Sequence, residues 1–381
     1  MVPKKWELTV IKQTSGQYRN VKAQLFRKDV SEIIIATDAG REGELVARWI
    51  LDKSGCHKPI KRLWISSVTD KAIREGFSHL RDGRQYNALY HAARSRAMAD
   101  WLVGLNATRA LTCKYNAQLS CGRVQTPTLS MIAQREAEIR SFRPEDYYGL
   151  TCTAGSVRWT WQHEKSKSTR SFQKSFITDL EARLNGETLT VTDIHQSAKK
   201  TFSPGLYDLT ELQRDANKRF GFSAKETLNI MQRLYEHHKV LTYPRTDSRY
   251  IGSDIVPTLK DRLRACNIGP YKKFIPQLLK APLKTSKAFV DDKKVSDHHA
   301  VIPTEEYVQL DHMSSEERKI YDLVVRRFIS VLYPPFEYEQ TTMKAVSAGQ
   351  NFTACGKVIL SSGWRSVYAS DGMAEDGNDE E

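Results

Sequence analysis

Residues 32–50 read EIIIATDAGREGELVARWI, and this stretch decides the first part of the fold. It opens with a short apolar run, EIIIA, and after the polar turn TDAGRE the apolar residues Leu45, Val46, Trp49 and Ile50 recur at helical spacing. A short apolar run followed by a 3.6-residue period predicts a strand, a loop and a helix. The loop therefore lies where the carboxyl end of a strand meets a helix N-terminus, a position at which α/β folds bind ligands.

That loop carries an acidic cluster, Asp38, Glu42 and Glu44, together with two glycines. Clustered carboxylates at such a position can hold Mg²⁺. The glycines would let the backbone approach a phosphate, and the helix N-terminus favours negative charge. The alternative is a solvated turn whose acidic residues simply suit the first turn of the helix. This stretch alone leaves both interpretations open.

Length and charge set broad limits on the fold and the partner. A chain of 381 residues predicts two to four domains. The net charge is +13, and because the last eleven residues hold six acidic and no basic side chains, residues 1–370 sum to +19. Such a basic body indicates a polyanion, nucleic acid first and an anionic membrane surface second.

The sequence argues against secretion and against a membrane span. No apolar run approaches ~18 residues, and the first ten residues, MVPKKWELTV, lack the features of a signal peptide. Six cysteines lie far apart with no C-x-x-C pair, which predicts reduced, mostly structural thiols and excludes a zinc ribbon within this chain. We therefore expect a cytoplasmic protein without a membrane partner.

Periodicity divides the rest of the chain into helical and β-rich parts. Residues 85–111 and 126–141 have a helical pattern, whereas 147–198 and 336–368 contain short alternating runs typical of strands. The region between the two β-rich parts is helical, with Asp208 and Glu211, and Ser223 and Glu226, at capping-box spacing. These patterns predict a β domain that is interrupted by a helical domain.

Two neighbouring segments have the composition of a nucleic-acid surface. LSCGRVQTPTL, residues 119–129, combines Arg123, Gln125 and two threonines at a helix start, and such donors suit a sugar-phosphate backbone. Upstream, residues 93–115 place arginines and Trp101 among small residues, as in proteins that hold single strands by charge and stacking. The alternatives are an ordinary capped helix and a core tryptophan.

The segment KVLTYPRTDSRYI, residues 239–251, contains a candidate nucleophile. A tyrosine has a pKa near ~10, so Tyr243 would need a nearby cation, and Arg245 is always charged. The alternative is a buried tyrosine with a polar tip before a turn.

The segment VSDHHAVIPT, residues 295–304, contains two adjacent histidines, whose side chains point apart on either a helix or a strand. One functional and one structural imidazole is therefore favoured over a metal site that uses both.

Taken together and in this order, five segments resemble the type IA DNA topoisomerases, on the bacterial topoisomerase III branch. They are TDAGREGE, ADWLVGLNATRALT, LSCGRVQTPTL, GFSAKETLNIMQRLYEHHKVLTYPRTDS and SDHHAVIPT. Five motifs in one order are far more specific than any one of them. The resemblance spans roughly residues 8 to 368, and it favours the functional interpretation of each segment.

The resemblance implies a multidomain fold with α/β, α and β parts. The expected domains are a partial Toprim domain (1–66), the first part of a helical DNA-binding domain that grips a single strand (67–146), the first part of a β arch (147–205), a helical domain with the catalytic tyrosine (206–334), the second part of the arch (335–370) and an acidic tail (371–381).

It also implies an activity. Tyr243 matches the tyrosine that attacks a phosphodiester of single-stranded DNA, forming a 5′-phosphotyrosine and releasing a 3′-hydroxyl without ATP. Arg245 would stabilise the charged phosphate, and His298 matches the active-site histidine of the family. The expected outcomes are relaxation of negative supercoils and decatenation, by a nucleoid-associated protein.

The implied cofactor is Mg²⁺, and the implied partner is single-stranded or locally unwound duplex DNA. Asp38 and Glu42 match the Toprim carboxylates, whereas Gly40 stands where the family pattern has its middle acid. The implied DNA contacts are Trp101, Arg109, Lys114, Ser120, Cys121, Gly122, Arg123, Val124, Gln125 and Arg245.

Both ends of the sequence depart from the family pattern. The first strand, with a catalytic glutamate and lysine, has no match in MVPKKWELTV, and the chain stops where the helical DNA-binding domain should resume, so we expect the middle of a longer enzyme. A catalytically inactive single-stranded DNA-binding remnant is the main alternative, and covalent capture of DNA separates the two. A Toprim nuclease or primase would not need Tyr243 and its flanking residues.

Overall fold

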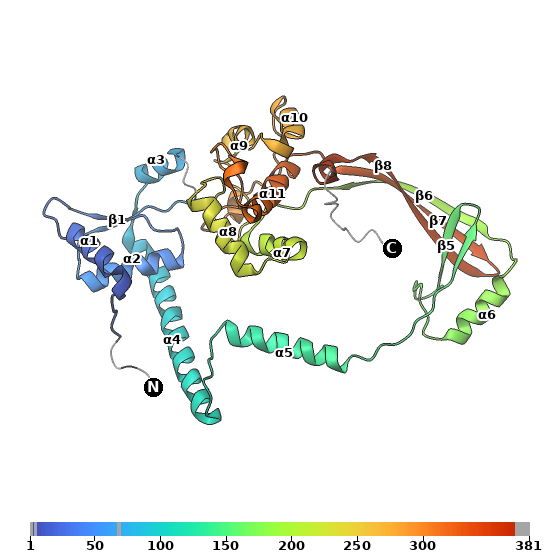
Figure 1. Ribbon diagram of the computed structural model, residues 1–381, viewed down its shortest axis with the longest axis horizontal. Helices are drawn as coiled ribbons and strands as arrows, with labels where there is room; N and C mark the ends of the chain where they lie inside the picture. Colours follow the sequence, from blue (N-terminus) through green and yellow to red (C-terminus); the bar gives the residue numbers. More distant parts are fainter. Residues whose placement is uncertain (1–2, 4–5, 67–69, 370–381) are drawn as a thin grey trace. The chain divides into compact units, whose positions relative to one another are not determined.

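The computed structural model describes residues 3, 6–66 and 70–369, and the chain divides into two compact units (Figure 1). Unit 1 consists of Met1–Ser141, Tyr207–Arg262 and Thr285–Glu306, and unit 2 of Phe142–Leu206, Leu263–Lys284 and Tyr307–Glu381. The helical region expected at 206–334 contributes to both. The six domain boundaries expected from the sequence stay predictions, and the acidic tail, 371–381, falls outside the described residues.

Unit 1 begins with a small α/β layer. Strand β1 (Ile33–Ile35) pairs in parallel with β2 (Ile60–Arg62), and β3 (Arg81–Asp82) pairs antiparallel with β2. Helices α1 (Ser15–Leu25), α2 (Arg41–Ser54) and α3 (Asp70–Ser78) accompany this sheet, and the buried core is Leu25, Ile35, Ala47 and Leu51. The strand, loop and helix predicted for residues 32–50 are confirmed as β1, a loop and α2.

Two helices continue unit 1. The long helix α4 (Asn87–Tyr115) packs on α2 through a buried cluster of Leu45, Tyr90 and Ala93, and α5 (Gln125–Ser141) follows after a loop. The helices predicted at 85–111 and 126–141 are thereby confirmed. Because α5 has no buried residue, its side chains are all solvent-accessible within the chain.

The part of unit 1 that carries Tyr243 starts with two capped helices. Asp208 accepts a hydrogen bond of 2.7 Å from the Glu211 amide at the start of α7 (Leu209–Phe220). Ser223 and Glu226 form a complete capping box at the start of α8 (Ala224–Glu236). Short 3₁₀ turns and helix α9 (Leu259–Ala265), whose last three residues belong to unit 2, interrupt the otherwise irregular chain that follows.

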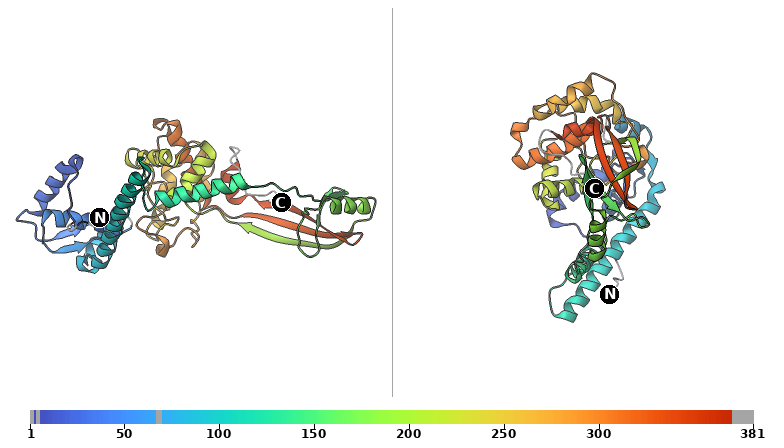
Figure 2. Two further views of the ribbon diagram at one scale, coloured as in Figure 1. Left: turned by 90° about the horizontal axis from the view of Figure 1, so that it is seen from below. Right: turned by 90° about the vertical axis from the view of Figure 1, so that its right-hand side faces the viewer.

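Unit 2 contains an antiparallel sheet with the strand order β4-β5-β8-β7-β6. Its strands are β4 (Thr151–Ala154), β5 (Val157–Gln162), β6 (Thr190–Thr201), β7 (Phe336–Ser347) and β8 (Gln350–Ser361). Figure 2 shows β6, β7 and β8 as long ribbons, and their pairing joins the two β-rich sequence regions into one sheet. The strands predicted within 147–198 and 336–368 are confirmed.

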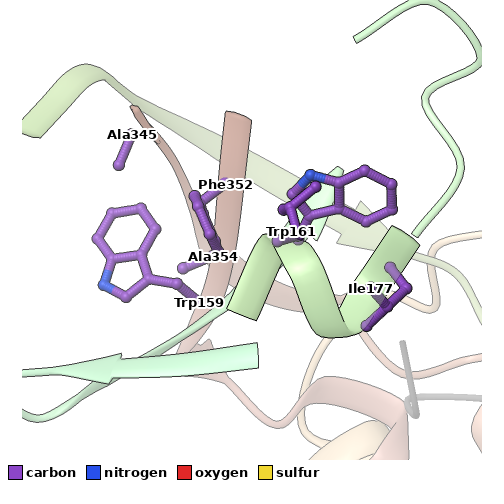
Figure 3. Close-up of a cluster of buried hydrophobic side chains, with 7 residues drawn as sticks. Trp159, Trp161, Ile177, Ala345, Phe352 and Ala354 are labelled. Carbon is purple, nitrogen blue, oxygen red and sulfur yellow. The ribbon is translucent and has the colours of Figure 1, made fainter. Parts of the chain in front are cut away.

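One buried hydrophobic cluster of unit 2 lies where helix α6 (Lys174–Leu184) packs on this sheet. This helix buries Ile177 and Leu180 against Trp159 and Trp161 of β5, together with small and aromatic residues of β7 and β8 (Figure 3). Alternation along β5 places both tryptophans on the same face, which is why that face becomes the core.

The remaining helices of unit 2 are α10 (Ile275–Leu279) and α11 (Ser315–Ser330), the latter with a capping box between Ser314 and Glu317. None of the six cysteines, all of which lie in the described residues, forms a disulfide. Within residues 3, 6–66 and 70–369, no helix combines the length and apolar character that crossing a membrane requires.

Candidate active site

Tyr243 follows α8 on an extended segment of unit 1. The amide of Thr242 donates to the carbonyl of Ile302 at 3.0 Å, and Leu241 forms a β-bridge with Pro303. This pairing fixes the register between the tyrosine segment and the segment SDHHAVIPT. As a result, Tyr243 and His298 lie side by side although they are far apart in the sequence.

The ring of Tyr243 is half-buried between two other rings. Its centroid lies 4.3 Å from that of His298, and Tyr235 packs edge-on at 5.5 Å. Burial raises the pKa of the Tyr243 phenol, and the carboxylate of Asp38 raises it further, whereas Arg245 opposes the shift. Tyr243 is therefore a neutral phenol at neutral pH, and it needs additional positive charge to react as phenolate.

The segment after Tyr243 is anchored through its hydroxyl groups. Thr246 Oγ1 donates to the carbonyl of His298 at 2.9 Å, and Ser248 Oγ donates to the carbonyl of Lys294 at 2.8 Å. These two hydroxyls thus hold backbone together, and both side chains are buried. Arg245, in contrast, is exposed and projects from a fixed backbone.

Asp38 completes this group of side chains. The Nε2 atom of His298 lies 3.8 Å from Oδ2 of Asp38, whose side chain is 62% exposed. Asp38, Tyr243 and His298 line one groove of about 920 Å³ within unit 1. The structure therefore brings together three of the residues that the sequence singled out from three separate segments.

A buried arginine, Arg62, supports the loop that carries Asp38 from the interior of the protein. Arg62 Nη1 donates to the carbonyl of Thr37 at 2.8 Å, and its Nε lies 3.0 Å from Oε2 of the fully buried Glu44. Glu44 belonged to the predicted acidic cluster, but its partners are Arg62 and Arg48, so it supports the loop from inside. Sequence reasoning missed Arg62, which is one of two adjacent basic residues in the short strand β2 and carries no pattern that marks it as buried.

Glu42 lies in the first turn of α2 and forms an ion pair of 2.8 Å with Arg96 of α4. In the described part of the chain, no three histidine, cysteine, aspartate or glutamate side chains are grouped so as to hold a metal ion. Asp38 and Glu42 stay predictions as metal ligands. Of the two, Asp38 is the one that lines the groove beside Tyr243.

The loop between α4 and α5 is fixed by hydrogen bonds of small residues. The amide of Cys121 donates to Thr108 Oγ1, and the amide of Gly122 donates to Thr126 Oγ1, both at 3.0 Å. Arg123 forms an ion pair with Asp100 of α4 beside a groove of about 350 Å³. The predicted segment 120–125 therefore shares one surface with α4.

Basic and aromatic side chains are exposed along this surface. Trp101 is 48% exposed and packs edge-on against Trp6, with ring centroids 5.2 Å apart, so the alternative of a core tryptophan is wrong. The other exposed members of the predicted contact set on this surface are Arg109, Lys114, Ser120, Arg123, Val124 and Gln125, and Arg245 is exposed beside Tyr243. Their roles in binding stay predictions.

Comparison with known proteins shows the family. A family model described as DNA topoisomerase matches residues 84–381, and a model of the Toprim domain matches residues 6–68. The chain belongs to the DNA topoisomerase family, on the type IA branch that includes bacterial DNA topoisomerase 3.

Individual relatives agree with this assignment. The chain is 58% identical to DNA topoisomerase 3 of Bacillus subtilis (strain 168) over 381 residues, which is 100% of this chain and 52% of the relative. It is 61% identical to DNA topoisomerase 3 of Bacillus cereus (strain ATCC 14579) over 369 residues, 97% of this chain and 50% of the relative. The chain thus spans about half the length of these relatives.

A solved structure matches the fold. Full-length topoisomerase I from Thermotoga maritima superposes with a TM-score of 0.69 at 23% identity, covering 97% of this chain and 62% of that one. At this identity the likeness concerns the fold alone. It supports a mixed α/β architecture that combines a Toprim domain with a topoisomerase core.

Proposed function

We propose that this chain carries the strand-cleavage centre of a type IA DNA topoisomerase. The Tyr243 hydroxyl oxygen attacks a phosphorus of single-stranded DNA, and the bond from phosphorus to the 3′ oxygen breaks. The phenol loses its proton and the departing 3′ oxygen gains one, which gives a 5′-phosphotyrosine and a 3′-hydroxyl. Because one phosphodiester replaces another, religation by the reverse steps needs no ATP.

The observation that carries this proposal is the convergence of Tyr243, His298 and Asp38 in one groove, with Arg245 exposed on the anchored segment beside it. The raised pKa of Tyr243 keeps the nucleophile neutral until charge is supplied. Arg245 would supply part of it by pairing with the reacting phosphate, where an aimed cation acts chiefly in the transition state. His298 packs on the phenol and orients it.

Toprim domains typically bind Mg²⁺, and the groove offers a suitable ligand. The Asp38 carboxylate is 62% exposed, while Arg62 fixes the backbone behind it. Asp38, with Glu42, would hold the ion, which keeps most of its other positions for water and phosphate oxygens. The bound ion would add positive charge near the reacting phosphate and support religation.

The surface on α4 and residues 120–125 would grip the strand. Exposed arginine and lysine side chains neutralise phosphates, and Trp101 offers a ring for stacking. Single-stranded or locally unwound DNA is the substrate that suits this surface. Relaxation of negative supercoils and decatenation would follow from cleavage and strand passage, in a cytoplasmic, nucleoid-associated protein.

A covalent-capture assay tests the proposal. The protein in its full-length context is incubated with single-stranded DNA labelled at its 3′ end, because the fragment joined to the tyrosine is the one that keeps that end, and is then denatured. We expect a labelled protein band that Tyr243→Phe abolishes and that Tyr235→Phe, in the neighbouring ring, retains. A band that persists in Tyr243→Phe would show that another residue is the nucleophile.

The alternative is a catalytically inactive remnant that binds single strands. Such a remnant would bind DNA through the same surface and the same net charge of +19 on residues 1–370, so strand binding does not distinguish the two functions. The unmodified protein in its full-length context decides between them: strand binding without any labelled adduct, with and without Mg²⁺, favours the remnant.

A further inference from the structure

The carboxylate of Asp297 lies so close to Gly40 that a Cβ atom at position 40 would require this carboxylate to move. A Cβ atom at Gly40 would lie 2.1 Å from Oδ2 of Asp297 and 2.6 Å from its Cγ. Gly40 stands in the loop after β1, and Asp297 stands in the segment that also carries His298. The carboxylate of Asp297 therefore occupies the place where a side chain at position 40 would begin.

This position is the one at which the Toprim pattern has its middle acid. The loop lacks a carboxylate at Gly40, and the carboxylate of Asp297, from a distant segment, lies where that side chain would be. Asp38 lies beside it, since the Gly40 amide donates to the Asp38 carbonyl at 2.8 Å and the next residue after Asp297, His298, lies 3.8 Å from Asp38.

We propose that Asp297 supplies the carboxylate that the Toprim loop lacks at Gly40, so that Asp38 and Asp297 together hold Mg²⁺. This inference rests on the proposed function for the presence of the ion. Asp38 and Asp297 are sufficient for Mg²⁺ even where Glu42 stays paired with Arg96, because the ion completes its octahedron with water and substrate phosphates. The ion would then link the Toprim loop to the segment that positions Tyr243.

The overlap between positions 40 and 297 predicts how substitutions at the two positions should combine. An aspartate at position 40 would collide with Asp297 and place two negative charges in contact, so Gly40→Asp alone should damage the site. Removing the Asp297 side chain clears the space. Gly40→Asp combined with Asp297→Ala would therefore return the acid to the Toprim loop and restore the pair with Asp38.

Metal affinity measured without DNA tests the proposal. Mn²⁺, a probe for Mg²⁺, is titrated into the chain and followed by electron paramagnetic resonance, with Mg²⁺ as competitor. We expect Asp297→Ala and Gly40→Asp each to weaken binding about tenfold or more, and the double variant to return to within about threefold of the unmodified chain. Asp311→Ala, which removes an exposed carboxylate of unit 2, is the matched control and should leave the affinity unchanged.

Asp297→Asn separates charge from folding. The amide fills the same space, so the fold should persist, as checked by urea denaturation, while the metal affinity should fall as far as in Asp297→Ala. Unchanged affinity in either Asp297 variant, a double variant no better than Asp297→Ala, or no Mn²⁺ binding by the unmodified chain would each overturn the proposal. The covalent-capture assay tests the proposed function separately, because failure of that function would appear there as absence of the adduct.

Discussion

Arg62 and Glu44 form an ion pair that is completely buried beneath the loop of Asp38. The Arg62 Nε atom lies 3.0 Å from Glu44 Oε2, and neither side chain is exposed. Arg62 also donates to the carbonyls of Thr37 and Leu63, both at 2.8 Å. Burial lowers the pKa of the Arg62 guanidinium and the Glu44 carboxylate opposes that shift, so Glu44 helps to keep Arg62 charged.

Breaking this pair should destabilise the chain strongly. Glu44→Gln leaves the buried Arg62 charge without its counterpart, which typically costs about 3–5 kcal/mol. Arg62→Met leaves Glu44 with Arg48 as its remaining partner, so its loss should be smaller. Urea denaturation should show this loss in the free energy of unfolding. Arg84→Met is the control, because its pair with Asp82 lies on the surface and should contribute little. Losses no larger than in the control would contradict a structural role for the pair.

Arg245 should matter more for cleavage than for binding. In the proposed reaction, Arg245→Ala removes the cation that pairs with the reacting phosphate, and one such group often contributes ~3 kcal/mol to the transition state. Binding to single-stranded DNA, in contrast, loses only one phosphate contact among many. Rates of adduct formation and binding constants, measured on the same oligonucleotide, test this. Equal losses in both would make Arg245 a plain phosphate contact.

Buried and exposed cysteines should differ in their rate of reaction with a thiol-modifying reagent. Cys266 has no exposed surface, and burial raises the pKa of its thiol to about 12, so at pH 8 roughly one molecule in ten thousand carries the thiolate. Cys113 and Cys355 are exposed. An aromatic disulfide reagent should modify these two rapidly in the native chain, and Cys266 only after denaturation. Mass spectrometry identifies the sites, and rapid native modification of Cys266 would contradict its burial.

Local features of the fold were predictable from the sequence because local interactions determine them. The strand and helix around residues 32–50 follow from hydrophobic period, and the start of α8 follows from the Ser223 and Glu226 box. The composition of the segments around them indicated Tyr243 and His298 as candidate site residues, and the family resemblance implied their roles. Their contact itself depends on the pairing of Thr242 with Ile302, which no local pattern encodes.

The supporting residues could not be predicted for the same reason. Glu44 looks like a solvated acid in the loop sequence, and only packing around Arg62 shows that it is buried. Gly40 looks like a loss of function in the acidic pattern until the approach of Asp297 is known. Both depend on contacts between distant segments, where sequence spacing carries no information about distance.

Asp100 and Arg123 should affect DNA binding in opposite directions. Asp100 pairs with Arg123 and lies 3.9 Å from Arg96, so it competes with phosphate for both arginines on the surface of α4. Asp100→Asn should therefore tighten single-stranded DNA binding several-fold, because less attraction within the protein must be given up.

Arg123→Ala should weaken binding at all sequences and should lower the slope of log K against log salt by about 0.7, the amount expected for one phosphate contact on a single strand. Fluorescence anisotropy with a labelled oligonucleotide at several salt concentrations measures both quantities. Arg19→Ala removes an exposed arginine of α1, outside this surface, and controls for net charge. If Arg19→Ala and Arg123→Ala change the affinity and the slope equally, binding depends on overall charge and not on the surface formed by α4 and residues 120–125.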